Sequence, residues 1–189
     1  SEGVLGGAFG GMSSRLTLWF ASGGASRISG GRPLLLAGVC GLIVAGIGVA
    51  SGMTWGTGYG AARAIIEGHD APLSFGAAKF VSTLATAAAG LPGGIFAPSL
   101  ATGAGLGNLL HALFPNEPTG ALVLLAMAGY FTGVVRAPLT AVIIMSETTG
   151  SRGLMLPLLA TALIAEPVAS LVCRERLYPG PSMGFLRPR

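Results

Sequence analysis

The chain has 189 residues, of which 51% are hydrophobic and only 10% are charged, and its mean hydropathy is +0.72. A soluble domain carries about 25% charged residues, so this composition excludes most soluble classes. The formal net charge of +4 comes from scattered arginines and not from a dense basic face, so nothing supports nucleic acid as a partner. We therefore expect an integral membrane protein.

Two uncharged runs, 33–62 and 80–116, are longer than the roughly 20 residues that span a bilayer. Apolar patterning and breakers predict these helices in chain order: 4–20, 34–55, 61–67, 74–89, 96–113, 119–132, 138–146 and 154–171. The helices at 119–132 and 138–146 are short for full spans. Short, interrupted helices are typical of proteins in which helix ends meet a ligand near the middle of the membrane.

The 32 glycines and 12 prolines favour closely packed and broken helices, as in polytopic channels and transporters. Cys40 and Cys173 form no disulfide framework, and His69 and His111 have no partners at metal-ligand spacing. We therefore expect no metal site. The opening residues lack the basic region of a signal peptide, and 174–189 form a polar tail, so we interpret the chain as part of a longer polypeptide.

A cluster of helix breakers, GLPGGIFAP at 90–98, interrupts the second uncharged run. Regular helix cannot continue through it, so we expect an irregular segment that ends where a helix begins near Phe96. The first turn of a helix presents backbone N–H groups and a positive dipole end, which together bind anions without a charged side chain. Spacing alone leaves two alternatives open, an anion site and a re-entrant segment that only packs.

Three motifs, GGIFAPSL at 93–100, GAGLG at 103–107 and VVRAPLTAVIIMSETTG at 134–150, resemble the second half of the CLC family of chloride channels and chloride/proton antiporters. The resemblance covers nearly the whole chain. It implies an all-α integral membrane fold of tilted and broken helices, in which 1–189 is the second of two inverted repeats and the first half is absent. It also implies a homodimer whose contact includes the first span and the helices at 138–146 and 154–171.

The resemblance also implies the site residues. In the family, backbone amides matching Ile95 and Phe96 coordinate the central chloride, and a tyrosine hydroxyl matching Tyr178 completes the site. The implied anion-binding residues are Gly94, Ile95, Phe96, Ala97, Pro98 and Tyr178. Pro179 departs from the family pattern, in which a helix follows the tyrosine. No cofactor is implied, since chloride is the transported ligand, and the serine and glutamates of the family's first half are absent from this chain.

Several charged residues lie within or beside the apolar segments. Lys79 could raise the local anion concentration, neutralise Glu147 or cap carbonyl groups, and we favour a structural role. Arg136 and Glu147 are interpreted as helix-end charges. Glu166 lies inside the last span, where a proton-relay role is conceivable.

The sequence as a whole predicts chloride transport, as part of a CLC-type channel or chloride/proton antiporter in a bacterial inner membrane, and no enzymatic activity. One alternative is a channel for neutral solutes built from half-helices. A membrane-embedded hydrolase is a weaker alternative, because it needs a nucleophile and a base on neighbouring spans, whereas both histidines lie at loop or helix ends.

Overall fold

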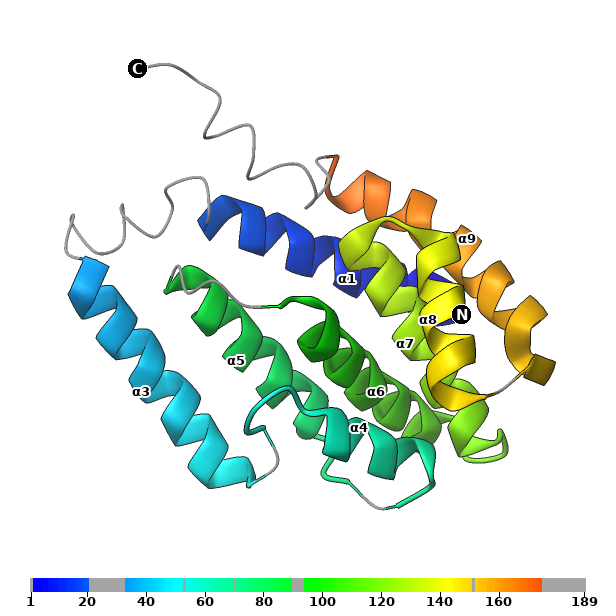
Figure 1. Cartoon of the computed structure of the whole chain (residues 1–189), viewed down its shortest axis with the longest axis horizontal. Helices are drawn as coiled ribbons and strands as arrows, with labels where there is room; N and C mark the ends of the chain where they lie inside the picture. Colours follow the sequence, from blue (N-terminus) through cyan, green and yellow to red (C-terminus); the bar gives the residue numbers. More distant parts are fainter. Residues whose placement is uncertain are drawn as a thin grey trace.

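The structure is a computed structural model that describes residues 2–20, 33–52, 54–69, 71–89, 94–150 and 152–174. The described residues are helical and contain no strand (Figure 1). In chain order the elements are α1 (Glu2–Trp19), α3 (Pro33–Ser51), α4 (Tyr59–Ile66), α5 (Phe75–Ala88), α6 (Phe96–Leu113), α7 (Thr119–Val135), α8 (Pro138–Thr149), the 3-10 turn η2 (Arg152–Leu154) and α9 (Met155–Val172). Every helix expected from the sequence is present.

Glycines let α1 pack closely between α7 and α9. A Cβ atom at Gly7 would lie 2.5 Å from the carbonyl oxygen of Ala165, and one at Gly10 would lie 2.4 Å from that of Tyr130. Such distances leave no room for any side chain, so the backbones touch directly. Because Gly3 meets Thr161 and Gly11 meets Ala169, α1 and α9 run in the same direction.

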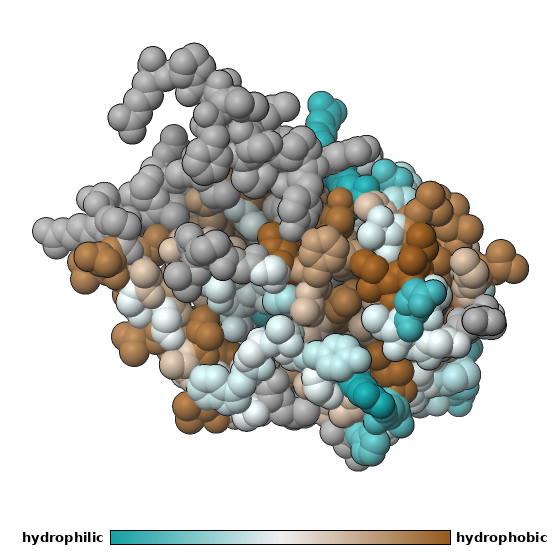
Figure 2. All heavy atoms as spheres, viewed as in Figure 1, coloured by the Kyte–Doolittle hydropathy of each residue, from teal (hydrophilic) through white to brown (hydrophobic). Residues whose placement is uncertain are grey.

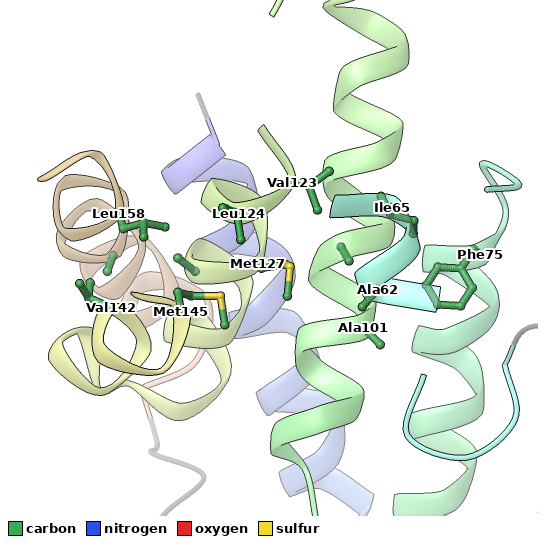
Figure 3. Packing of buried hydrophobic residues seen from close by; sticks show 13 residues of the cluster. Ala62, Ile65, Phe75, Ala101, Val123, Leu124, Met127, Val142, Met145 and Leu158 are labelled. Atoms are coloured by element: carbon green, nitrogen blue, oxygen red, sulfur yellow. The ribbon is translucent and has the colours of Figure 1, made fainter. Parts of the chain in front are cut away.

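The main apolar core lies where α4, α6, α7, α8 and α9 converge (Figure 3). Its largest fully buried side chains include Ile65, Phe75 and Met145. The buried members of this cluster are Ala62, Ile65, Phe75, Ala101, Ala104, Val123, Leu124, Met127, Ala128, Val142, Met145, Leu158 and Ala162. This core fixes α6 against α7, and therefore fixes the start of α6 in space.

The outer helices present apolar side chains on their open faces. Leu34 is 87% exposed on α3, and Leu171 is 87% exposed on α9. In Figure 2, brown, apolar residues lie among paler and polar ones over the regions of both helices. Among the described helices, α3 and α9 are long and apolar enough to cross a bilayer, through windows 34–51 and 155–172. Exposed apolar faces of this length suit a hydrocarbon environment and not water.

Candidate anion-binding site

The breaker cluster leads directly into α6, as the sequence predicts. Gly94 and Ile95 are non-helical, Phe96 is the first residue of the helix, and Ile95 makes no side-chain capping bond. The Ser99 amide donates to the Ile95 carbonyl at 3.0 Å. The segment 90–93, which includes Gly93, lies outside the described residues.

Pro98 occupies the first turn of α6, where its missing N–H costs no intrahelical bond. One turn further on, the Thr102 hydroxyl donates to the Pro98 carbonyl at 2.9 Å. The helix is therefore regular from its first turn, and its amide dipoles are aligned toward its start. No charged side chain occurs in the sequence between Lys79 and Glu117, so the polarity of this helix end comes from the backbone.

Neighbouring helices hold this helix end in place. Ile95 packs against the buried Tyr130 and Val134 of α7, together with Phe80 of α5. The rings of Phe96 and Phe131 lie 5.2 Å apart at a tilted angle. Because these contacts fix both residues at the helix start, the amides of the first turn are preorganised.

The same helix end is open on one side. A Cβ atom placed on Gly94 would meet no atom of the described residues within 4 Å, and Phe96 is 40% exposed. The sequence-predicted residues Gly94, Ile95, Phe96, Ala97 and Pro98 are thus brought together at one accessible helix start. Tyr178, which the sequence assigns to the same site, lies outside the described residues.

Buried hydroxyl groups lie behind the site, and the sequence analysis missed them. Tyr130 is 3% exposed and interacts through its side chain with Ser13 of α1 and Thr102 of α6. The Ser14 hydroxyl donates to the Val134 carbonyl at 2.9 Å, across 120 residues of sequence. In the sequence these residues appear only as polar residues within apolar runs, and that pattern does not show which of them contact one another.

Lys79 binds two carbonyl groups, and no carboxylate of the described residues pairs with it. Its ammonium group donates to the Thr54 oxygen at 3.0 Å and to the Gly56 oxygen at 2.6 Å, and the residue is only 3% exposed. Gly58, at φ 77°, lies over the lysine side chain. The structure thus supports the carbonyl-capping role among the three that the sequence left open, and Glu147 is exposed elsewhere.

Arg136 also meets a helix end, as the sequence predicts. It ends α7 in a left-handed conformation, φ 59°, and its guanidinium donates to the Ala169 carbonyl of α9 at 3.0 Å. Arg136 is 9% exposed, and no carboxylate of the described residues pairs with it. Its positive charge therefore lies against the carbonyl end of α9, which is the favourable end for a cation.

A pocket of about 320 Å³ opens beside the first turns of α6. Ala97 and Leu100 contribute from α6, and Thr148 and Thr149 contribute from the end of α8. At its rim Arg63 donates to Glu67 at 2.8 Å, and this hydrogen bond lowers the pKa of the Glu67 carboxyl from its ordinary value. The sequence analysis did not foresee this pocket, because the end of α4 and the start of α8 are 72 positions apart along the chain.

The remaining titratable side chains within the described residues gather into no site. His111 shares a hydrogen bond with Thr119 at 3.0 Å, His69 lies 4.0 Å from Glu67 at the surface, and both cysteines are buried thiols. Within the described ranges, no group of three histidine, cysteine or acidic residues could hold a metal ion.

The chain is similar in sequence to known proteins. The profile of a family described as voltage gated chloride channel matches residues 2–170. The chain is also 37% identical, over 107 residues, to an H(+)/Cl(-) exchange transporter ClcA of Vibrio campbellii (strain ATCC BAA-1116). That alignment covers 53% of this chain and 23% of the transporter.

Two solved structures share the fold. One is a CLC-type fluoride/proton antiporter, with a TM-score of 0.77 and 23% identity over 95% of this chain and 44% of that chain. The other is a eukaryotic CLC transporter, with a TM-score of 0.73 and 23% identity over 96% of this chain and 34% of that one. The chain thus spans less than half the length of these relatives.

Proposed function

The chain belongs to the voltage gated chloride channel family, and from this membership we propose that it transports anions as one half of a CLC-type transport unit. It is an all-α integral membrane protein with the fold of the CLC transporters. The observation that carries the proposal is the start of α6, an accessible helix N-terminus without a charged side chain, formed by Gly94 to Pro98. Backbone amides there bind an anion weakly enough for its release.

We propose chloride as the physiological anion, with the Tyr178 hydroxyl as a further ligand and residues 1–189 as the second of two repeats. The similarity to a chloride exchanger and, in fold, to a fluoride/proton antiporter makes the choice between these halides the central question of specificity. The site uses amides and hydroxyls only, so this choice depends on how closely the backbone surrounds the ion. A bacterial inner membrane and a homodimer complete the proposal.

The helices proposed for the dimer contact carry large apolar side chains on open faces. Ile143 is 56% exposed on α8, and Leu156 and Leu163 are 79% and 53% exposed on α9. Exposed apolar side chains of this kind suit a second copy of the protein that presents the same residues, as a two-fold contact requires.

The proposal is tested by anion flux from liposomes that contain the two-repeat polypeptide, with chloride and pH recorded together. Chloride efflux that competes with other halides supports anion transport. Efflux that is insensitive to anion identity would support the neutral-solute channel. Chloride-driven proton movement identifies an antiporter, and chloride movement alone identifies a channel.

A matched pair of variants isolates the backbone amide. Phe96→Pro removes the N–H of the first residue of α6, a position that accepts proline. Phe96→Ala keeps the N–H and controls for the lost ring. A hydrogen bond to a charged group contributes about 1.5–3 kcal/mol, so we expect at least about a tenfold loss of anion affinity in the proline variant alone. Equal affinity in both variants would contradict amide coordination.

A further inference from the structure

Tyr130 of α7 contacts the start of α6 by two separate routes. Its ring is part of the buried cluster against which Ile95 packs, and Ile95 is the last residue before the helix. Its hydroxyl is hydrogen-bonded to the side chain of Thr102, whose own hydroxyl donates to the Pro98 carbonyl at 2.9 Å. The two routes therefore reach the first turn of α6 just before its first residue and at its third residue.

The hydroxyl groups form one directed chain of hydrogen bonds. A hydroxyl donates a single hydrogen, and the hydrogen of Thr102 is given to Pro98. Thr102 therefore accepts from the Tyr130 hydroxyl, and the Tyr130 oxygen accepts in turn from Ser13 of α1. All three side chains are buried, with no more than 7% of any residue exposed. The chain thus runs from α1 through α7 to the first turn of α6, out of reach of water.

The backbone around Tyr130 is itself held closely by its neighbours. On the side of α1, a Cβ atom at Gly6 would lie 2.7 Å from the Tyr130 amide nitrogen. On the side of α6, a Cβ atom at Gly103 would lie 2.7 Å from the Cα atom of Met127 and 3.3 Å from the Cβ atom of Tyr130. Because α7 touches the backbones of both helices, Tyr130 has a fixed position relative to α6.

The next residue of α7, Phe131, completes this grip on the helix start. It is fully buried, and its ring lies 5.2 Å from that of Phe96. Residues on α7 therefore hold Ile95 and Phe96 directly and Pro98 through Thr102. Donors held at one spacing favour the ion whose radius matches it, whereas donors that can move adapt to ions of several sizes. Fluoride and chloride carry the same charge and differ in radius, so the rigidity of this turn bears on the choice between them.

We propose that Tyr130 is a positioning residue that sets the preference of the site among halides by holding the first turn of α6 in one geometry. Its hydroxyl is engaged by Ser13 and Thr102, so it acts on the ion through the backbone and not as a ligand. With the chain of hydroxyls intact, the amides keep one spacing and discriminate between ions by size. Without it, the turn adapts and the preference decreases. This inference rests on the proposed anion site and adds the residue that tunes it.

The test compares the dissociation constants of fluoride, chloride and bromide, measured by isothermal titration calorimetry on the two-repeat polypeptide. Tyr130→Phe removes only the hydroxyl and keeps the ring against Ile95. One net hydrogen bond corresponds to about a two- to tenfold factor, so we expect the ratio of Kd values between the preferred halide and the others to decrease by about that factor. Thr102→Val breaks the same chain one step later and should produce the same decrease.

Three further variants separate positioning from a general loss of stability. Thr102→Ser keeps a hydroxyl and should retain the preference. Ser14→Ala is the matched control, because the Ser14 hydroxyl also links α1 to α7, through the Val134 carbonyl at 2.9 Å, but does not belong to the chain that reaches α6. It should leave the ratio unchanged. In the double variant Tyr130→Phe with Thr102→Val, the decrease should equal that of either single variant, since both break one chain.

The results separate the role of Tyr130 from the proposed function. An unchanged ratio in Tyr130→Phe and Thr102→Val, or an equal decrease in Ser14→Ala, would overturn the positioning role and leave the anion site in place. Absence of halide binding by the unmodified protein would overturn the proposed function and this inference together. If Tyr130→Phe does not fold, Thr102→Val and Thr102→Ser decide: a preference lost in the first and kept in the second supports the role, and equal preference in both overturns it.

Discussion

Lys79 is the only lysine of the chain, and its role is decided by residues far away in sequence. Its two carbonyl partners, Thr54 and Gly56, precede it by 25 and 23 residues. The sequence shows that a cation lies in an apolar helix, but it does not show which acceptors a folded chain brings to it. A buried ammonium group without acceptors would be very costly, and the turn between α3 and α4 supplies them.

Substitution of Lys79 should affect stability more than transport. Lys79→Met removes both charge-assisted hydrogen bonds and leaves two carbonyls in an apolar setting, so we expect a loss of about 3 kcal/mol in unfolding free energy. Lys79→Arg keeps a cationic donor and should lose less. Thermal unfolding followed by tryptophan fluorescence measures the effect, because Trp55 lies within the anchored turn. Altered anion selectivity with an unchanged melting temperature would instead assign Lys79 to the pathway.

The candidate site was predicted from the sequence as far as local rules allow. Phe96 begins α6 as expected, because glycines and prolines stop one segment and permit the next. The packing of Ile95 on Tyr130 and the hydroxyl groups behind it could not be predicted, because Tyr130 lies 35 positions from Ile95 and 117 from Ser13 along the chain. The role of Tyr178 stays a prediction.

At the level of helices, the sequence predicted well where each helix lies along the chain, and less well the residue at which it ends. The segments expected at 119–132 and 138–146 extend to Val135 and Thr149. The first ends where Arg136 turns left-handed, and the second ends at Gly150 with φ 63°. Gly133, one residue beyond the predicted end of α7, packs closely against Gly10 of α1, which a local pattern does not reveal.

Gly105 in α6 allows close packing against another helix, whereas Gly38 in α3 packs against none of the described residues. Substitution at each position can measure this difference. A Cβ atom at Gly105 would lie 2.2 Å from the Cα atom of Gly76 in α5, whereas one at Gly38 of α3 would meet nothing within 4 Å. Gly105→Ala should therefore push α6 away from α5 and lower the free energy of unfolding by about 1–3 kcal/mol. Gly38→Ala should be neutral or should stabilise by up to about 1 kcal/mol, because it favours the helix.

Unfolding in mixed detergent micelles, followed by circular dichroism, compares the two variants directly. Both substitutions add one methyl group to a helical glycine, so intrinsic helix propensity cancels between them. Similar stabilities would show that α5 and α6 do not touch at Gly105.

At the scale of the whole molecule, the open space at the start of α6 agrees with the short length of the chain relative to its solved relatives. The chain spans 44% and 34% of the two solved relatives that share its fold, and the start of α6 is closed by α5 and α7 on one side only, with open space at Gly94. An ion held there contacts amides from one wall. A pathway needs further groups around the ion to replace its hydration shell, so the proposed pathway would need structure beyond the described helices.

The chain alone should therefore fold without conducting. In liposomes that contain only residues 1–189, we expect chloride efflux equal to that of protein-free liposomes, whereas the two-repeat polypeptide should conduct. Circular dichroism and the fluorescence of Trp19 and Trp55 verify that the reconstituted chain is folded, so that absent flux reflects an incomplete pathway. Adding the first repeat as a separate polypeptide should restore flux, because the apolar faces on α3 and α8 remain available for packing. Selective chloride flux from the chain alone, comparable to that of the two-repeat protein, would show instead that α6 and its neighbours form a complete pathway.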